Sequence, residues 1–175
     1  MKSRNITLIE GRGHLVATDT VEVNGQNVQG RNVVLASGSY ARSLPGLEIG
    51  GRIITSDEAL QLDYVPKSVV VLGGGVIGVE FASVWTSFGT NVTIVEALPH
   101  LVPNEDESLS KALERAFRKR GIGFKVGVRF AGATQDDNGV HVSLESGETI
   151  DAELLLVAVG RGPSTNGLGL SLIHI

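Results

Sequence analysis

The sequence predicts an α/β fold, and two observations carry that prediction. An apolar run at residues 68–72 leads into the glycine-rich segment 73–78, which is followed by apolar residues at helical spacing. A second apolar run at residues 91–95 then ends in Glu96. Strands that alternate with helices favour βαβ units and a parallel sheet. We therefore expect a Rossmann-like domain with a parallel sheet and a β-meander.

Short β elements are expected ahead of this domain. Residues 6–10, 15–16 and 20–23 are runs of strand length, and the pair Asn24-Gly25 after them is a strong hairpin signal. Residues 32–36 have the character of a buried strand.

A connector is expected over residues 41–67, where proline and glycine interrupt the pattern. Beyond Glu96, a second helix should start at Asp106 or Ser108 and end at Gly121. Helical spacing predicts its apolar face as Leu109, Ala112, Leu113, Ala116 and Phe117. Three further runs of strand length complete the pattern: residues 124–126, 140–144 and 154–159.

Composition limits the function classes. The chain has 175 residues, 42% of them hydrophobic and 19% charged, which suits one ordinary domain or pieces of two. A net charge of −4 and scattered lysines and arginines give no sign of a nucleic-acid surface. The sequence has no apolar stretch of membrane-helix length and no recognisable signal peptide, so a cytoplasmic setting is expected.

Thiol and metal chemistry are limited as well. The chain has no cysteine, so it can supply neither a disulfide, nor a thiolate zinc site, nor a redox dithiol. No two of its four histidines stand at metal-ligand spacing, so we expect no metal site.

Gly73, Gly75 and Gly78 form a G-x-G-x-x-G pattern between a strand and a helix, with Glu96 about twenty residues further on. The first glycine permits a tight turn, the second lets a pyrophosphate approach the backbone, and the third allows helix and strand to pack closely. The start of the helix offers free N–H groups and a partial positive charge. The segment predicts a dinucleotide site; the alternative is a turn that serves only close packing. Four neighbours are expected to line the loop and the start of the helix, as cofactor contacts or as plain core: Gly74, Val76, Ile77 and Val79.

Glu96, at the end of the second strand, suits a carboxylate that accepts hydrogen bonds from an adenosine ribose. Its charge would repel a 2′-phosphate, and residues 97–99 contain no arginine to receive one. NAD is therefore favoured over NADP. The alternative is a solvated carboxylate at a strand end.

Three segments resemble one family, the flavoprotein pyridine nucleotide-disulfide oxidoreductases. Residues 69–82 resemble its NAD-binding signature. Residues 33–39, followed by Leu44-Pro45-Gly46, are similar to its ATG segment, although Ser37 stands where threonine is usual. Residues 154–163 are similar to the hydrophobic strand and the G-R-x-P turn that follow the NAD domain. All three occur in the family's order.

Within the family, residues 81–85, 88–89 and 95–96 favour the dihydrolipoamide dehydrogenases, the E3 components of 2-oxoacid dehydrogenase complexes. The resemblance implies FAD and NAD as cofactors, and electron transfer from dihydrolipoyl groups through a protein disulfide and flavin to NAD. It also implies a homodimer that meets the lipoyl domains of those complexes. The first FAD-binding unit, the paired cysteines and the C-terminal histidine–glutamate pair have no match here.

The chain therefore resembles an internal fragment of such an enzyme. We expect it to hold no catalytic residue and to be inactive alone. Two alternatives stay open: a non-catalytic NAD-binding module, or a piece of a related mycothione reductase, soluble transhydrogenase or quinone reductase.

The resemblance also assigns roles to single residues. It implies that Glu80 faces the nicotinamide end of NAD, where the alternative is a carboxylate favoured by the dipole in the first helical turn. It implies an adenine-side backbone contact for Phe130 and a place beside NAD for Gly160, with ordinary packing as the alternative for Phe130. Gly13 and Ser37-Gly38-Ser39 match positions near FAD, with plain turn residues as the alternative.

The expected domain organisation follows from these matches. Residues 1–65 should be the C-terminal portion of a first FAD-binding segment, residues 66–161 the NAD-binding domain, and residues 162–175 a return to the FAD domain.

Overall fold

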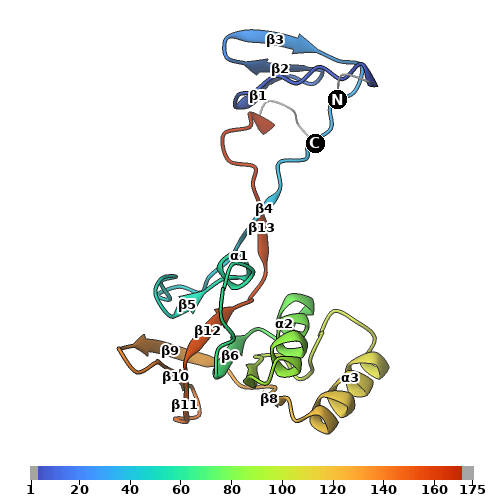
Figure 1. Cartoon of the computed structure of the whole chain (residues 1–175). Helices are drawn as coiled ribbons and strands as arrows, with labels where there is room; N and C mark the ends of the chain where they lie inside the picture. The colour runs from blue at the N-terminus through green and yellow to red at the C-terminus, as the bar shows by residue number, and fades with distance from the viewer. Residues whose placement is uncertain (1–3, 171–175) are drawn as a thin grey trace. The chain divides into compact units, whose positions relative to one another are not determined.

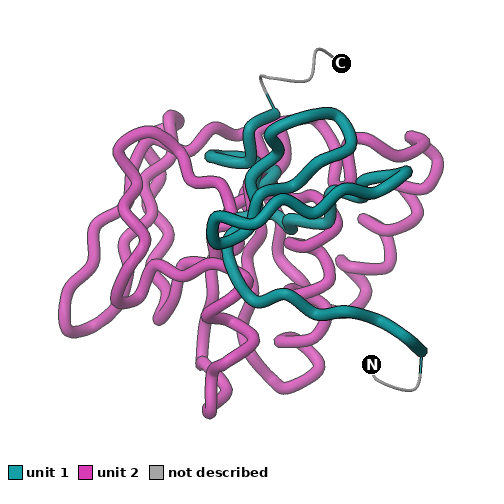
Figure 2. Tube along the Cα trace, turned by 90° about the horizontal axis from the view of Figure 1, so that it is seen from above, with its two compact units in different colours: residues 1–40, 163–175 teal, residues 41–162 magenta. Residues whose placement is uncertain are grey.

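The computed structural model describes residues 4–170 (Figure 1). The chain forms two compact units, one of residues 1–40 and 163–175 and the other of residues 41–162 (Figure 2). Residues 41–65, which the sequence assigned to the first FAD-binding segment, thus group with the predicted NAD-binding domain. The FAD and NAD assignment of the domains stays a prediction, and its last residues, 171–175, lie outside the described part.

A five-stranded parallel sheet forms the centre of the larger unit. Its order is β5-β12-β6-β7-β8, and every adjacent pair of strands runs parallel. The strands are β5 (Ile53–Ile54), β12 (Leu154–Val157), β6 (Ser68–Leu72), β7 (Asn91–Val95) and β8 (Gly123–Lys125). This arrangement confirms the predicted α/β class and its parallel sheet.

Within residues 4–170, three helices accompany the sheet: α1 (Ser56–Ala59), α2 (Val76–Ser87) and α3 (Glu107–Arg120). Asp106 caps α3 by accepting the N–H of Ser108 at 2.9 Å, and Gly121 ends it with a φ of 78°. Both predicted ends of this helix are confirmed. No helix in the described part of the chain is long and apolar enough to cross a bilayer.

The buried face of α3 differs from the predicted one. Leu109 is 57% exposed, whereas Ser110, Glu114 and Phe117 are buried. Helical spacing of apolar residues was misleading here because Ser110 and Glu114 are buried through hydrogen bonds to the loop that precedes the helix.

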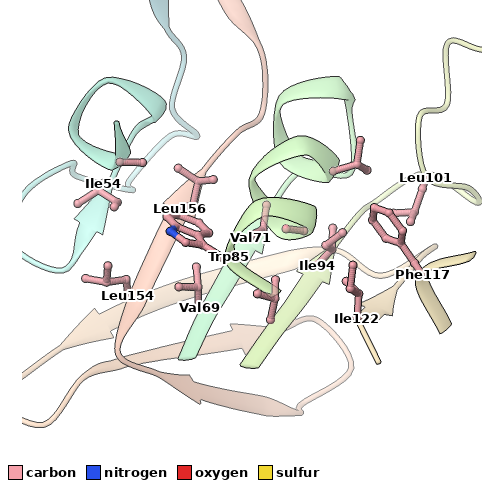
Figure 3. Close-up of a cluster of buried hydrophobic side chains, with 14 of the residues drawn as sticks. Ile54, Val69, Val71, Trp85, Ile94, Leu101, Phe117, Ile122, Leu154 and Leu156 are labelled. Carbon is pink, nitrogen blue, oxygen red and sulfur yellow. The ribbon is translucent and has the colours of Figure 1, made fainter. Parts of the chain in front are cut away.

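The two faces of the parallel sheet contribute to two separate cores. Alternate residues of each strand point to opposite faces, so Val69 and Val71 pack with the helices while Val70 and Leu72 pack on the other side. Figure 3 shows the helix-side cluster, with Trp85 of α2 and Phe117 of α3 beside the sheet residues. The larger unit therefore has a helix layer, a sheet layer and a further β layer.

That further layer is the predicted meander. It contains β9 (Phe130–Gln135), β10 (Val140–Leu144) and β11 (Thr149–Ala152), paired antiparallel in the order β11-β10-β9. Val140, Val142 and Leu144 are buried and belong to the core on that side of the parallel sheet.

The smaller unit contains an antiparallel sheet of β1 (Gly13–Ala17), β2 (Thr20–Val23) and β3 (Gln26–Gln29). Asn24 and Gly25 turn the chain between the last two strands with φ values of 52° and 79°, which confirms the predicted hairpin. The strands predicted at residues 6–10 and 32–36 are wrong, and Val34 is 85% exposed. Among the described residues, no neighbouring strand pairs with either segment, and an unpaired run cannot form a ladder.

The chain passes between the two units at β4 (Ser39–Ala41) and β13 (Arg161–Pro163), and these strands pair with each other. Just inside the larger unit, the N–H of Arg42 donates to the carbonyl oxygen of Gly160 at 2.9 Å.

Candidate functional site

The glycine turn joins the carboxyl end of β6 to the start of α2. Gly73 has a φ of 108°, in the region that disfavours side chains, and a Cβ there would overlap the backbone of Ala158. A Cβ on Gly78 would overlap the carbonyl oxygen of Gly73, so the third glycine lets the helix approach the turn. Gly75 differs, because a Cβ there would meet nothing within 4 Å. The backbone at Gly75 is thus open for a ligand to approach.

The start of α2 faces the same opening. Gly75 is its N-cap residue, and no described side chain caps it. The first N–H groups of a helix have no partner within the helix, and they carry the positive end of its dipole. An uncapped start beside an open glycine is a suitable place for a phosphate.

Glu96 lies directly after β7 and contacts the glycine turn. Its Oε2 accepts the N–H of Gly74 at 2.6 Å, and its Oε1 accepts the N–H of Leu98 at 2.8 Å. The carboxylate is therefore oriented by two backbone donors. Each oxygen keeps a further acceptor site that a sugar hydroxyl can use.

These features border a groove of about 690 Å³ in the larger unit. Its lining comes from the carboxyl edge of the parallel sheet, the loop after β7 and the meander, which is where ligands bind in open α/β sheets. The structure brings the following predicted residues together in its lining: Gly73, Gly75, Val76, Ile77, Glu96, Phe130 and Gly160.

Other predicted residues lie elsewhere. Gly74, Gly78 and Val79 are buried and do not line the groove. The sequence placed Glu80 in the first turn of its helix, which is wrong: α2 begins at Val76, and its first turn contains no acidic residue. Glu80 is exposed in the second turn, too far along for the dipole to account for it. Its contact with a nicotinamide stays a prediction.

The residues predicted near FAD lie in the smaller unit. Gly13 begins β1, and a Cβ on it would lie 3.2 Å from Val21, which is close contact within the hairpin sheet. Ser37 and Gly38 precede β4, which Ser39 begins, and the carbonyl oxygen of Gly38 accepts the N–H of Ser164 at 3.0 Å. Their role at a flavin stays a prediction.

Several lining residues escaped sequence reasoning. Leu98 and Val159 follow β7 and β12, so the rule that ligands bind at the carboxyl ends of parallel strands could have found them. Pro103, Arg129 and Glu145 come from a loop and from the meander side, and their sequence neighbourhood gives no such signal. Among the described residues, no cluster of three or more histidine, aspartate and glutamate side chains could hold a metal ion.

The comparisons with known proteins agree with this geometry. Residues 1–174 match the model of the pyridine nucleotide-disulphide oxidoreductases, and the chain belongs to that family. The family's cofactors are FAD and NAD.

Three individual relatives are similar to almost the whole of this chain. The dihydrolipoamide dehydrogenase of Chaetomium thermophilum is 40% identical over 99% of this chain, which covers 37% of that protein. The dihydrolipoyl dehydrogenase of Cupriavidus necator is 36% identical over 99% of the chain, which covers 39% of it. A leghemoglobin reductase of Glycine max is 36% identical over 99% of the chain, which covers 35% of it. The chain thus spans well under half the length of these relatives.

Solved structures show the same fold. LpdA from Mycobacterium tuberculosis has a TM-score of 0.82 and 31% identity, with 99% of this chain and 40% of that chain covered. The HOCl-induced flavoprotein disulfide reductase RclA from Escherichia coli has a TM-score of 0.82 and 29% identity, with 96% of this chain and 39% of that chain covered.

Proposed function

We propose that the groove binds NAD. The pyrophosphate would lie against the open backbone at Gly75 and the uncapped start of α2. The adenosine ribose would lie at Glu96, whose two backbone donors orient the carboxylate toward the turn. Phe130 and Gly160 line the same groove, which supports an adenine-side contact for Phe130 and a place beside NAD for Gly160.

The observation that carries this proposal is the contrast between neighbouring glycines. A side chain at Gly73 or Gly78 would collide with backbone atoms, so close packing alone explains glycine at these two positions. A side chain at Gly75 would collide with nothing, so packing gives no reason for a glycine there. A ligand that comes close to the protein backbone does give a reason for glycine at this position.

Gly75→Ala tests the proposal in the full chain. Its φ of −73° is ordinary for alanine, and the methyl group would enter open space, so we expect the fold to be kept. NADH affinity, followed by the fluorescence of the bound nucleotide, should fall by at least about tenfold, or about 1.4 kcal/mol. Gly132→Ala is the matched control, because it also adds a methyl group to open space but lies outside the groove lining. Unchanged NADH affinity in Gly75→Ala would refute the site.

At the level of the whole enzyme, we propose that the chain is the NAD-binding part of a dihydrolipoyl dehydrogenase. In that enzyme, bound FAD and NAD would supply the redox chemistry that carries electrons from a dihydrolipoyl group and a protein disulfide to NAD. The chain's own residues would bind and orient the nicotinamide nucleotide, and the cofactors supply the redox chemistry. The disulfide would come from outside this cysteine-free chain. A homodimer, lipoyl domains as partners and a cytoplasmic location complete this proposal.

Alternatives in substrate are supported by the names of relatives. The matches include a leghemoglobin reductase and a HOCl-induced disulfide reductase, so the electron donor or acceptor could differ. NADH titration together with dihydrolipoamide turnover separates these cases. We expect NADH binding without turnover for this chain, and dihydrolipoamide-dependent NAD reduction for the enzyme that contains it. Binding by the chain with no such reduction by that enzyme would favour another reductase.

A further inference from the structure

A small group of residues beside the glycine turn does not itself line the groove. It consists of Leu101 and Val102 from the loop after β7, and of Ser110 and Glu114 from α3; we call it the buttress. We propose that the buttress positions the glycine turn for the pyrophosphate, with Glu114 and Ser110 as positioning residues. The inference rests on the proposed NAD site.

The buttress contacts the turn at Gly74. The N–H of Val102 donates to the carbonyl oxygen of Gly74 at 2.7 Å, and Leu101, fully buried, packs so closely that a Cβ on Gly74 would lie 2.7 Å from its Cδ2. A trans peptide is planar, so its C=O and N–H point in opposite directions. Fixing the carbonyl of Gly74 therefore fixes the direction of the N–H of Gly75. That N–H belongs to the residue that is open to the groove.

Val102, which makes this contact, has an unfavourable backbone conformation. Its φ is 44°, a left-handed conformation that is rare for a β-branched residue. Such a conformation persists only where the surrounding structure determines it, and it clusters at ligand sites. Here the hydroxyl of Ser110 donates to the carbonyl oxygen of Val102 at 3.3 Å, and the N–H of Glu105 donates to the same oxygen at 2.9 Å. The next residue, Pro103, lines the groove, so the strained position lies between the contact with the turn and the groove lining.

Glu114 fixes the other end of the buttress. Its side chain is only 8% exposed, and its Oε1 accepts the N–H of Leu101 at 3.2 Å. Its Oε1 also lies 3.4 Å from Nδ1 of His100, and its Oε2 lies 3.6 Å from Nη2 of Arg118. A buried carboxylate is costly to keep unless its partners are specific. An apolar side chain at position 114 could not accept the N–H of Leu101. Leu101 directly precedes Val102, whose N–H donates to Gly74.

The test compares NADH affinity with stability in the full chain. Glu114→Ala and the milder Ser110→Ala should each weaken NADH binding by roughly tenfold, the factor that corresponds to about 1.4 kcal/mol. Glu114→Gln should restore affinity to within about threefold of wild type, because an amide oxygen still accepts the N–H of Leu101. Thr90→Val is the matched control: it removes another buried hydrogen bond, from the Thr90 hydroxyl to the carbonyl oxygen of Pro66 at 2.8 Å, away from the groove lining.

The outcomes separate the two proposals. No NADH binding by the wild-type chain would refute the proposed site itself. Wild-type binding with unchanged affinity in Glu114→Ala and Ser110→Ala would overturn the buttress alone. The buttress is also overturned if Thr90→Val, at an equal loss in melting temperature, weakens binding as much. Failure of Glu114→Gln to restore affinity would likewise overturn the role assigned to the Leu101 contact.

Discussion

The carboxylate of Glu96 accepts the N–H of Gly74 at 2.6 Å, across 22 residues of sequence. The residue that the sequence predicts at the sugar therefore also helps to fix the turn that the sequence predicts at the phosphates. The two ends of the proposed adenosine diphosphate site are thus connected through a single side chain. Changes at Glu96 should affect both cofactor choice and the shape of the turn.

Replacing Glu96 with arginine should shift preference from NAD toward NADP. The change removes the charge that repels a 2′-phosphate and provides a cation that attracts it. It also removes the acceptor for Gly74 and Leu98, so affinity for NADH should fall by roughly tenfold, or about 1.4 kcal/mol. The ratio of NADH to NADPH dissociation constants measures the shift. Glu96→Gln, which keeps an acceptor without the charge, is the control; equal affinity of the wild-type chain for both nucleotides would contradict the assignment.

Gly78→Ala should destabilise the fold by about 1–3 kcal/mol, the usual cost of overpacking. The added methyl group would overlap the carbonyl oxygen of Gly73, which is backbone and cannot move aside. Urea unfolding measures the loss. Gly75→Ala, three residues earlier and open to solvent, should unfold within about 1 kcal/mol of wild type. Equal stability of the two variants would contradict the described turn.

His141 should make stability depend on pH. Its Nδ1 lies 2.7 Å from Oδ1 of Asp151, and its Nε2 lies 3.5 Å from Oδ2 of Asp136. Hydrogen bonds that the ring of His141 donates to Asp151, and then to Asp136, raise the pKa of His141 above its ordinary value of 6.5. The protonated form is therefore favoured by folding, and its contribution is fully present below pH 6.5 and lost as the pH rises through the raised pKa.

The measurement is the thermal midpoint of wild type and of His141→Gln from about pH 5.5 to about pH 8.5. We expect the wild type to be the more stable at the acidic end and the difference to shrink toward the alkaline end. A difference that stays constant with pH, or grows as the pH rises, would show that the pair with Asp151 does not form.

Thr55→Ala should cost about 1 kcal/mol, the typical value for a lost helix cap. Thr55 caps α1 by accepting the N–H of Asp57 at 3.2 Å, and Glu58 accepts the N–H of Thr55 at 2.8 Å in return. The side-chain hydrogen bond from Thr55 also lowers the pKa of Glu58. Thr55→Ser keeps the hydroxyl and should retain most of the stability in urea unfolding. An alanine variant as stable as wild type would argue against the reciprocal cap.

Local chemistry made part of the fold predictable. The hairpin at Asn24-Gly25 and the ends of α3 at Asp106 and Gly121 depend on residues that act within a few positions of themselves. The parallel sheet was predictable for a related reason, because a glycine turn between an apolar run and a helix has few other uses.

Partners distant in sequence explain what could not be predicted. Residues 32–36 have the composition of a strand, yet a strand also needs a neighbour, and no described strand pairs with them. Ser110 and Glu114 are polar, yet they are buried because a loop supplies their hydrogen-bond partners. At the site, Arg129, Glu145 and Glu96 line one groove although they come from separate segments of the chain. No local sequence pattern predicts that they do so.

The pairing of β4 with β13 has one more consequence. Since the N–H of Arg42 donates to the carbonyl oxygen of Gly160, the first and last residues of the larger unit lie close together. A compact unit whose two ends are neighbours tolerates circular permutation and insertion into the loop of another protein with little distortion of either backbone. Residues 41–162 thus meet the geometric condition for circular permutation or for insertion into another protein, which is that the two ends lie close together.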